Sequence, residues 1–375
     1  MNDMITQSNH PRPFTIAIPD ETLDLIRRRL ELSAPRRHAP ADDRDWRYGT
    51  DAGWVAGLRQ YWLTRYDWRA AERHLNRLPQ FMASVDGTDI HFIHLRGDGS
   101  RLPLVLTHGW PGSFFEFDRV VEPLVAAGFD VVVPSLPGFG FSGRPDGIIG
   151  PRHVASLWRR LMVDVLGYPR FGAQGGDWGS AVTTWLGRDH ADVVAAIHLN
   201  LFMGPVVPSA GDDAETLAWR QRLLAVQQMQ SAYMMEQATK PQTIGLALAD
   251  NPLGFAAWVV EKFHGWGDTK GDIDGHFGKD ALLTNLMIYL VNDAVQSAIW
   301  MYHSIFTEPR SDDRVTVPTG CALFPAEFLP YPPRAVAERC YHVTRWTPMP
   351  AGGHFAAMEE PAAFSREVAA FFADF

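Results

Sequence analysis

The chain has 375 residues, of which 46% are hydrophobic and 21% charged, a composition typical of a globular protein with a sizeable core. Its formal net charge of −9 argues against nucleic acid as a partner, because an acidic surface repels phosphate backbones. Two cysteines, Cys321 and Cys340, are too few for a disulfide framework and favour a reduced, cytoplasmic protein. We expect neither a signal peptide nor a membrane anchor, since no apolar run is long enough to serve as either.

The N-terminal part of the chain begins with a polar arm and then predicts two helices and a hairpin. Residues 18–32 have apolar residues at helical spacing, with acids early and arginines late, which suits the helix dipole. A second helical pattern covers about 51–66. Residues 80–95 predict two strands that turn at Asp86 and Gly87.

From residue 102 the pattern changes to apolar strands that alternate with helices. Strands are predicted at 102–109, 129–138, 170–176, 195–201, 315–325 and 341–349, and helices near 114–126, 151–166, 179–188 and 360–373. Such an alternation predicts an α/β protein with a mostly parallel sheet and helices on both faces.

One long stretch interrupts this alternation, because residues 203–308 are rich in helical patterns and read as an inserted cap. We therefore expect four segments. They are an N-terminal segment with the first hairpin at 1–95, the first half of an α/β core at 96–202, a helical cap at 203–308 and the second half of the core at 309–375.

The sequence Gly-Gly-Asp-Trp-Gly-Ser at residues 175–180 lies between a predicted strand and a predicted helix. Gly175 and Gly179 each stand two positions from Asp177, which is the pattern of a nucleophile elbow, a tight turn that exposes one side chain above the sheet. Since the central residue is an aspartate, we expect a carboxylate nucleophile. The alternative is an aspartate that merely caps a helix after a glycine-rich turn.

The sequence His-Gly-Trp-Pro-Gly at residues 108–112 directly follows the first core strand. In the α/β-hydrolase fold this loop supplies one N–H of an oxyanion hole, and the residue after the nucleophile supplies the other. The expected donors are the backbone N–H groups of Trp110 and Trp178. Pro111 would fix the shape of the loop, for example through a cis Trp110–Pro111 bond. The alternative is an ordinary turn before a proline.

His354 follows two glycines after the last predicted strand, where its side chain can reach over the top of the sheet. The α/β-hydrolase order of nucleophile, acid and histidine places the acid after the preceding strand, where Glu327 lies. Glu359 and Glu360 are rivals, but they begin the last helix, where acidic residues need no catalytic role.

Six stretches of the chain resemble the microsomal-type epoxide hydrolases, and the resemblance covers nearly its whole length. They are PFTIAIPDETLDLIRRRL, YDWRAAERHLNRLPQF, HGWPGS, GGDWGS, TKPQTIGLALADNPLGFAAWVVEKF and GGHFAAMEEP. The resemblance implies an α/β-hydrolase core, an N-terminal meander over core and cap, and hydrolysis of epoxides to vicinal diols. It also implies that Asp177 is the nucleophile, His354 the base and Glu327 its orienting acid. Membrane-bound members carry an N-terminal anchor helix that this sequence lacks, so it resembles a soluble, bacterial-type member.

The family also uses two cap tyrosines to hold the epoxide oxygen. Tyr233, in SAYMMEQATKP, matches the first tyrosine motif well, and Tyr302, in WMYHS, matches the second more loosely. Tyr289, in MIYL, is the alternative for the second tyrosine. The expected substrates are an apolar epoxide and water, and the resemblance implies no metal or organic cofactor.

Rival functions remain open at this stage. A haloalkane dehalogenase would use the same Asp177 nucleophile, with the indoles of Trp110 and Trp178 binding the halide. A serine esterase is disfavoured, because Ser180 stands three residues past the apex of the elbow. A binding protein without catalysis is the alternative from another class. The substrate, a role in detoxification or in biosynthesis, and assembly as a homodimer are also open.

Overall fold

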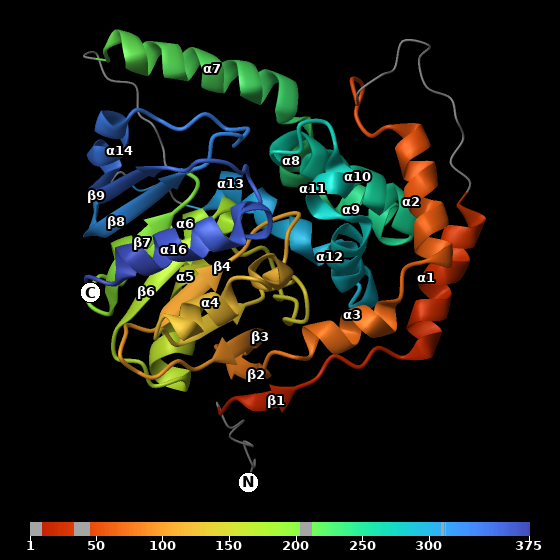
Figure 1. Cartoon of the computed structure of the whole chain (residues 1–375), viewed down its shortest axis with the longest axis horizontal. Coiled ribbons are helices and arrows are strands. Elements are labelled where there is room, and N and C mark those ends of the chain that lie inside the picture. Colours follow the sequence, from red (N-terminus) through yellow and green to blue (C-terminus); the bar gives the residue numbers. More distant parts are fainter. Residues whose placement is uncertain (1–9, 34–45, 203–211, 309–310, 312) are drawn as a thin grey trace.

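The computed structural model describes residues 10–33, 46–202, 212–308, 311 and 313–375, and a nine-stranded sheet forms its centre (Figure 1). Most of the predicted polar arm and the first residues of the predicted cap lie outside the described residues. The strands are β1 (Arg12–Phe14), β2 (Gln80–Val85), β3 (Thr88–Leu95), β4 (Leu104–Thr107), β5 (Val131–Pro134), β6 (Phe171–Gly175), β7 (Val194–Leu199), β8 (Val315–Leu323) and β9 (Tyr341–Pro348).

The order of the strands is β1-β2-β3-β5-β4-β6-β7-β8-β9. The strands from β5 to β9 in this order run parallel, whereas β1, β2 and β3 form an antiparallel extension that joins β5. Every residue of β4, β5, β6 and β7 is buried, as expected for parallel strands that are covered on both faces. The predicted α/β architecture is therefore confirmed.

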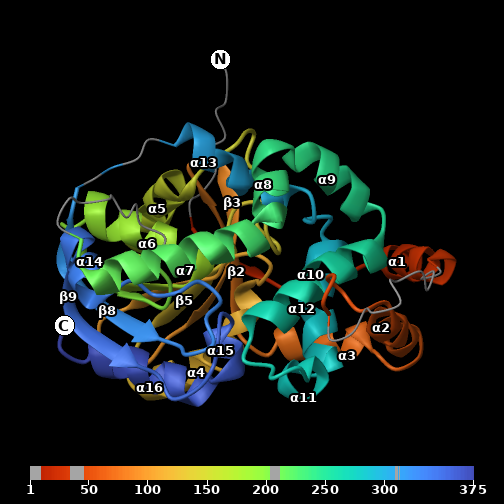
Figure 2. The same ribbon diagram turned by 90° about the horizontal axis from the view of Figure 1, so that it is seen from above.

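Helices cover both faces of the sheet: α5 and α6 lie on one face, and α4 and α16 on the other (Figure 2). The helices of this part of the chain are η1 (Phe114–Phe117), α4 (Val121–Ala126), α5 (Pro151–Arg160), η2 (Leu161–Val165), α6 (Asp177–Asp189), α14 (Arg334–Cys340), α15 (Ala356–Glu359) and α16 (Pro361–Phe372). Because the strands they cover are parallel, the carboxyl ends of the strands share one edge, where loops can place functional side chains.

One predicted helix differs from the structure. The stretch 114–126 forms a 3₁₀ turn and then the separate helix α4, which begins at Val121. Pro123 explains the break, because a proline has no N–H to donate and is tolerated only in the first turn of a helix.

The predicted hairpin is confirmed and has its turn at the expected residues. Val85 pairs with Thr88, so the loop consists of Asp86 and Gly87 alone. Their φ angles are 53° and 80°, as the common two-residue hairpin turn requires at both central positions.

The remaining helices lie beside the sheet, and the N-terminal helices pack on their far side (Figure 1). They are α7 (Ala214–Gln230), α8 (Ala232–Thr239), α9 (Pro241–Ala249), α10 (Pro252–Trp266), α11 (Ile273–Phe277), α12 (Lys279–Val291), η3 (Ser297–His303) and α13 (Ser304–Thr307), with α1 (Asp20–Leu32), α2 (Ala52–Thr64) and α3 (Trp68–Leu75) outside them. Within the described ranges, no single helix combines the length and the apolar character needed to cross a bilayer. The division into four segments stays a prediction.

The connection between β6 and α6 is tight enough to require glycine on both sides of Asp177. A Cβ on Gly175 would overlap the carbonyl of Gly179, and a Cβ on Gly179 would overlap the carbonyl of Thr107 in β4. Both obstacles are backbone atoms, which cannot rotate aside as the end of a side chain can. The helix therefore starts directly at the end of the strand only because these two residues have no side chain.

We predict that Gly179→Ala lowers the free energy of unfolding by about 3 kcal/mol or more, because the added methyl group has no space. Urea denaturation would measure the change. Gly265→Ala in α10 is the matched control, since a Cβ there meets nothing within 4 Å and alanine is the better helix former. Equal stability of the two variants would contradict the prediction.

Candidate active site

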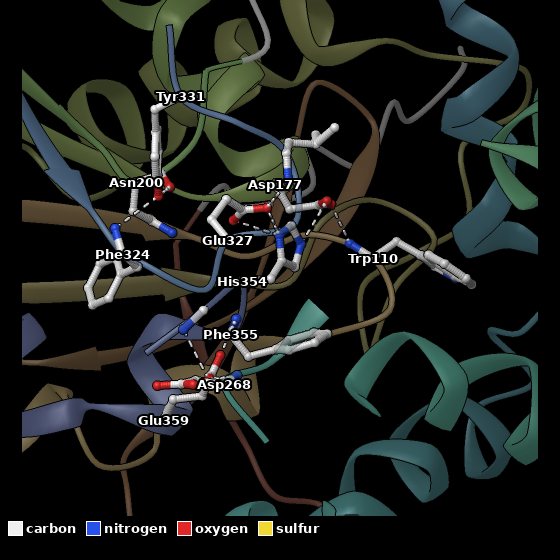
Figure 3. A network of polar contacts seen from close by, with 12 residues as sticks. Trp110, Asp177, Asn200, Asp268, Phe324, Glu327, Tyr331, His354, Phe355 and Glu359 are labelled. Atoms are coloured by element: carbon white, nitrogen blue, oxygen red, sulfur yellow. Dashed lines mark hydrogen bonds and ion pairs between the residues drawn. The ribbon is translucent and has the colours of Figure 1, made fainter. Parts of the chain in front are cut away.

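Asp177 stands at the junction of β6 and α6 with a φ of 46°, in the left-handed region that is unfavourable for residues other than glycine. The backbone N–H of Trp110 donates to Oδ1 of Asp177 at 2.8 Å (Figure 3). Gly109 leaves room for this carboxylate, because a Cβ there would overlap it. The glycine before Trp110 thus allows the loop after β4 to approach the predicted nucleophile closely.

The ring of His354 bridges two carboxylates (Figure 3). Its Nε2 lies 3.2 Å from Oδ2 of Asp177, and its Nδ1 lies 3.0 Å from Oε2 and 3.1 Å from Oε1 of Glu327. The side chains of His354 and Glu327 are 3% and 1% exposed. The structure therefore brings the three predicted residues together in the predicted order, with the carboxylate of Glu327 fixing the orientation of the imidazole.

This arrangement controls the charge of His354. Burial by itself would lower the pKa of His354, but the negative charge of Glu327 and the contact with Asp177 outweigh burial and raise that pKa well above its ordinary value. The two carboxylates thus favour the protonated form of the His354 ring. Any reaction that removes the charge of Asp177 will lower the pKa of His354.

The two predicted oxyanion donors differ in their present contacts. The backbone N–H of Trp110 bonds to Asp177, whereas the backbone N–H of Trp178 has no hydrogen bond to another group within the described residues. Trp178 belongs to the first turn of α6, where backbone N–H groups have no partner within the helix. Its backbone N–H can therefore donate a hydrogen bond to a negative charge that develops nearby. The Trp110–Pro111 bond is cis, as the sequence suggested.

Tyr233 and Tyr302 meet beside the indoles of Trp110 and Trp178. The ring of Tyr233 stacks on Trp110 with centroids 5.4 Å apart, and the ring of Tyr302 stands edge-on to Trp178 at 4.9 Å. Burial, followed by nearby negative charge that includes Asp177, raises the pKa of both phenols well above the ordinary value. Both hydroxyls therefore keep their protons unless a strong base, such as an alkoxide, forms nearby.

Tyr289, the alternative to Tyr302, has a different environment. It is fully buried, and its hydroxyl donates to the carbonyl of Gly112. The rings of Tyr233 and Tyr302 lie 6.1 Å apart, so Tyr302 is the residue that the fold pairs with Tyr233. The functional role of either tyrosine stays a prediction.

Glu359 is a rival acid to which the structure gives a structural task. Its side chain is fully buried and accepts hydrogen bonds from the backbone N–H groups of Gly353 at 3.0 Å and Phe355 at 2.8 Å, on either side of His354. It also accepts from the backbone N–H of Asp268 at 2.6 Å (Figure 3). The carboxylate therefore holds the loop of His354 and does not contact the ring. Sequence reasoning missed this role, since nothing in the motif GGHFAAMEEP shows which amides a carboxylate will meet.

We predict that Asp177→Asn lowers the pKa of His354, because one of the two charges that stabilise the imidazolium is removed. The expected fall is roughly one pH unit or more, and NMR titration of the ring would measure it. Asp164→Asn, whose carboxylate is half exposed and pairs with Arg159, serves as the control and leaves the titration of His354 unchanged. An unchanged pKa of His354 in Asp177→Asn would contradict the assigned contact.

Comparison with known proteins places the chain in a family. Residues 11–117 match the family model described as epoxide hydrolase N terminus, and residues 103–242 match that of the alpha/beta hydrolase fold. Juvenile hormone epoxide hydrolase 2 from Ctenocephalides felis is 33% identical over 95% of this chain and 84% of its own length. The structure of Aspergillus niger epoxide hydrolase is similar with a TM-score of 0.87, 32% identity and 98% of each chain covered. Juvenile hormone epoxide hydrolase from the silkworm Bombyx mori gives a TM-score of 0.91 at 26% identity, over 99% of this chain and 96% of that one. The chain therefore belongs to the epoxide hydrolase family of the α/β-hydrolase fold.

Proposed function

We propose that this protein hydrolyses an apolar epoxide to a vicinal diol through an ester formed on Asp177. The observation that carries the proposal is the position of His354, whose ring lies between Asp177 and Glu327 while Trp110 donates to the same Asp177 carboxylate. The similar proteins are epoxide hydrolases, which supports the substrate class.

In the first step, an oxygen of Asp177 attacks one ring carbon of the epoxide, and the bond from that carbon to the epoxide oxygen breaks. A carboxylate needs no base to activate it, unlike a serine hydroxyl. Tyr233 and Tyr302 hydrogen-bond the epoxide oxygen, and one of them transfers its proton to it. Positioned proton transfer of this kind contributes roughly 10²–10⁴-fold. A haloalkane would make no use of this proton, because halide leaves as a stable anion, so the tyrosine pair favours an epoxide.

In the second step, His354 takes a proton from water, and the water oxygen attacks the side-chain carbonyl carbon of the esterified Asp177. The N–H groups of Trp110 and Trp178 stabilise the resulting oxyanion. The bond from the carbonyl carbon to the alkyl oxygen breaks, the proton of the new carboxyl group passes to that oxygen, and the diol leaves. Asp177 keeps one oxygen from water. The proton that His354 releases after ester formation returns through solvent to the tyrosinate, and the proton that it takes from water restores its protonated form.

The contacts of His354 suit this order of events. While Asp177 is a free carboxylate, its contact raises the pKa of His354. Ester formation removes that charge, so the pKa of His354 falls at the stage at which a base is required. Glu327 remains beside Nδ1 throughout and keeps Nε2 directed toward Asp177.

An apolar cavity supports the choice of an apolar substrate. It has a volume of about 240 Å³ and lies between α7 and the loop after β8. Tyr233 and Phe328 line it, and the ring of Phe328 lies 5.4 Å from that of His354. The cavity therefore leads to the aromatic groups around the site, with Trp219 and Leu223 of α7 on its wall.

The role we propose is the detoxification of such epoxides in the cytoplasm, where the buried thiol of Cys321 would stay reduced.

We predict that His354→Gln forms the ester but hydrolyses it slowly, because a base is needed only in the second step. Mixing the variant with styrene oxide and measuring the intact mass should show one substrate added, and peptide mapping should place the adduct on Asp177. Asp177→Asn is the control and should gain no mass.

Isotope labelling tests the same intermediate in the wild-type enzyme. A single turnover in ¹⁸O-water, with enzyme in excess, should give a diol without the label and place the label in Asp177. Direct transfer of the label to the diol would exclude the ester route.

We predict that Tyr233→Phe and Tyr302→Phe slow ester formation strongly and leave the fold intact, because each loses a proton donor to the epoxide oxygen. Stopped-flow measurement of tryptophan fluorescence would follow this step, since Trp110 adjoins both rings and Trp178 adjoins that of Tyr302. Tyr289→Phe is the matched control and should alter stability more than ester formation, because its hydroxyl bonds to a backbone carbonyl. Normal ester formation in Tyr302→Phe would remove Tyr302 from the site.

A further inference from the structure

The second glycine of the motif at residues 108–112 leaves room for a second carboxylate. A Cβ on Gly112 would overlap the side-chain oxygen and Cδ of Glu116, just as a Cβ on Gly109 would overlap the carboxylate of Asp177. Glu116 lies in the 3₁₀ turn η1, at the end of the same loop whose Trp110 bonds to Asp177. The glycines of the loop after β4 therefore leave room for two carboxyl groups, one from the junction of β6 and α6 and one from η1.

Glu116 and Asp177 line the same small cavity, together with His354 and Asn200. Its volume of about 10 Å³ is room for about one water molecule, and a water in such a site needs two to four polar partners. The carboxylates, the imidazole and the Asn200 amide provide them. Gln174 donates to Oδ1 of Asn200 at 2.8 Å, which leaves the amide nitrogen of Asn200 as the group able to face the cavity.

We propose that Glu116 positions the water that hydrolyses the ester on Asp177, an inference that rests on the proposed function. One hydrogen of the water goes to Nε2 of His354, while a carboxyl oxygen of Glu116 accepts a hydrogen bond from the other. With both hydrogens engaged, a lone pair of the water oxygen points at the carbonyl carbon of Asp177. Glu116 gains and loses no proton in this step, and the second hydrogen stays on the attacking oxygen.

The surroundings of Glu116 allow it to accept a hydrogen bond from water in the second step. Burial raises the pKa of Glu116 to about 8, with His354 acting against burial and the charge of Asp177 adding to it. Ester formation removes the charge of Asp177, and His354 becomes neutral when it acts as the base, so these two opposite influences on Glu116 disappear together. A carboxyl group offers an oxygen that accepts a hydrogen bond in either protonation state.

The test separates the two steps in the full-length enzyme, with styrene oxide as the probe. Enzyme in excess is mixed with the epoxide, quenched in acid at intervals and analysed by intact mass, which gives the rates of ester formation and ester hydrolysis. Glu116→Leu removes the acceptor and should slow hydrolysis roughly ten- to a hundred-fold, the range for one hydrogen bond to a charged group, while ester formation is unchanged. Glu116→Gln keeps one oxygen and should restore part of the rate.

Two further variants keep the test decisive. Gly112→Ala leaves Glu116 in the sequence but displaces its flexible side chain, and should slow hydrolysis selectively even if Glu116→Leu fails to fold. Glu122→Leu is the matched control, since this glutamate follows in α4 with a side chain that is 63% exposed, and it should leave both rates unchanged.

The inference is overturned if the variants that fold hydrolyse the ester at the wild-type rate or lose both steps equally. Absence of any ester in the wild-type enzyme would instead contradict the proposed function, so the two failures are distinguishable.

Discussion

The contact of one buried imidazole with two carboxylates is the interaction on which the rest of the site depends. Asp177 follows β6, Glu327 follows β8 and His354 follows β9, so residues that are far apart in sequence meet at one edge of the sheet. Two carboxylates this close to one ring favour its protonated form, which reduces their mutual repulsion. The parallel arrangement of these strands brings the ring within hydrogen-bond distance of both carboxylates.

Helices α8 and η3 complete this arrangement, because they bring Tyr233 and Tyr302 beside the indole of Trp110. The N-terminal segment packs against two neighbouring helices, α10 and α12. The hydroxyl of Tyr61 in α2 bonds to Asp280 at 2.9 Å, at the start of α12. The family model of the N terminus, which covers residues 11–117, thus includes a helix that contacts both of them.

The sequence was sufficient for the features that local geometry dictates. The two glycines around Asp177 and the glycines before His354 mark tight turns after strands, and the hairpin at Asp86 and Gly87 follows from residues that tolerate positive φ. The start of α4 was not predicted correctly. Pro123 is compatible with any position in the first turn of a helix, so the sequence did not show that the helix begins at Val121. The roles assigned to Asp177, His354 and Glu327 rest on proximity and stay predictions.

The features that the sequence could not show depend on contacts between residues that are far apart in the chain. Tyr289 and Tyr302 both follow apolar residues in helical stretches, and only their packing against Gly112 or Tyr233 separates them. Glu359 and Glu116 were missed as contributors for the same reason, since one is defined by distant backbone amides and the other by a shared cavity. A carboxylate of this kind has no local pattern, whereas a turn does.

The hydrogen bonds of Glu359 limit which part of the structure can move when a molecule enters or leaves the site. This carboxylate joins the amides beside His354 to Asp268 and His276, which lie beyond α10 and in α11. Movement of Asp268 and His276 away from this loop would remove hydrogen-bond donors from the buried side chain of Glu359 and would displace the loop that carries His354. The cavity along α7 is lined by none of these residues, so a molecule can occupy it without disturbing the hydrogen bonds that hold the loop of His354.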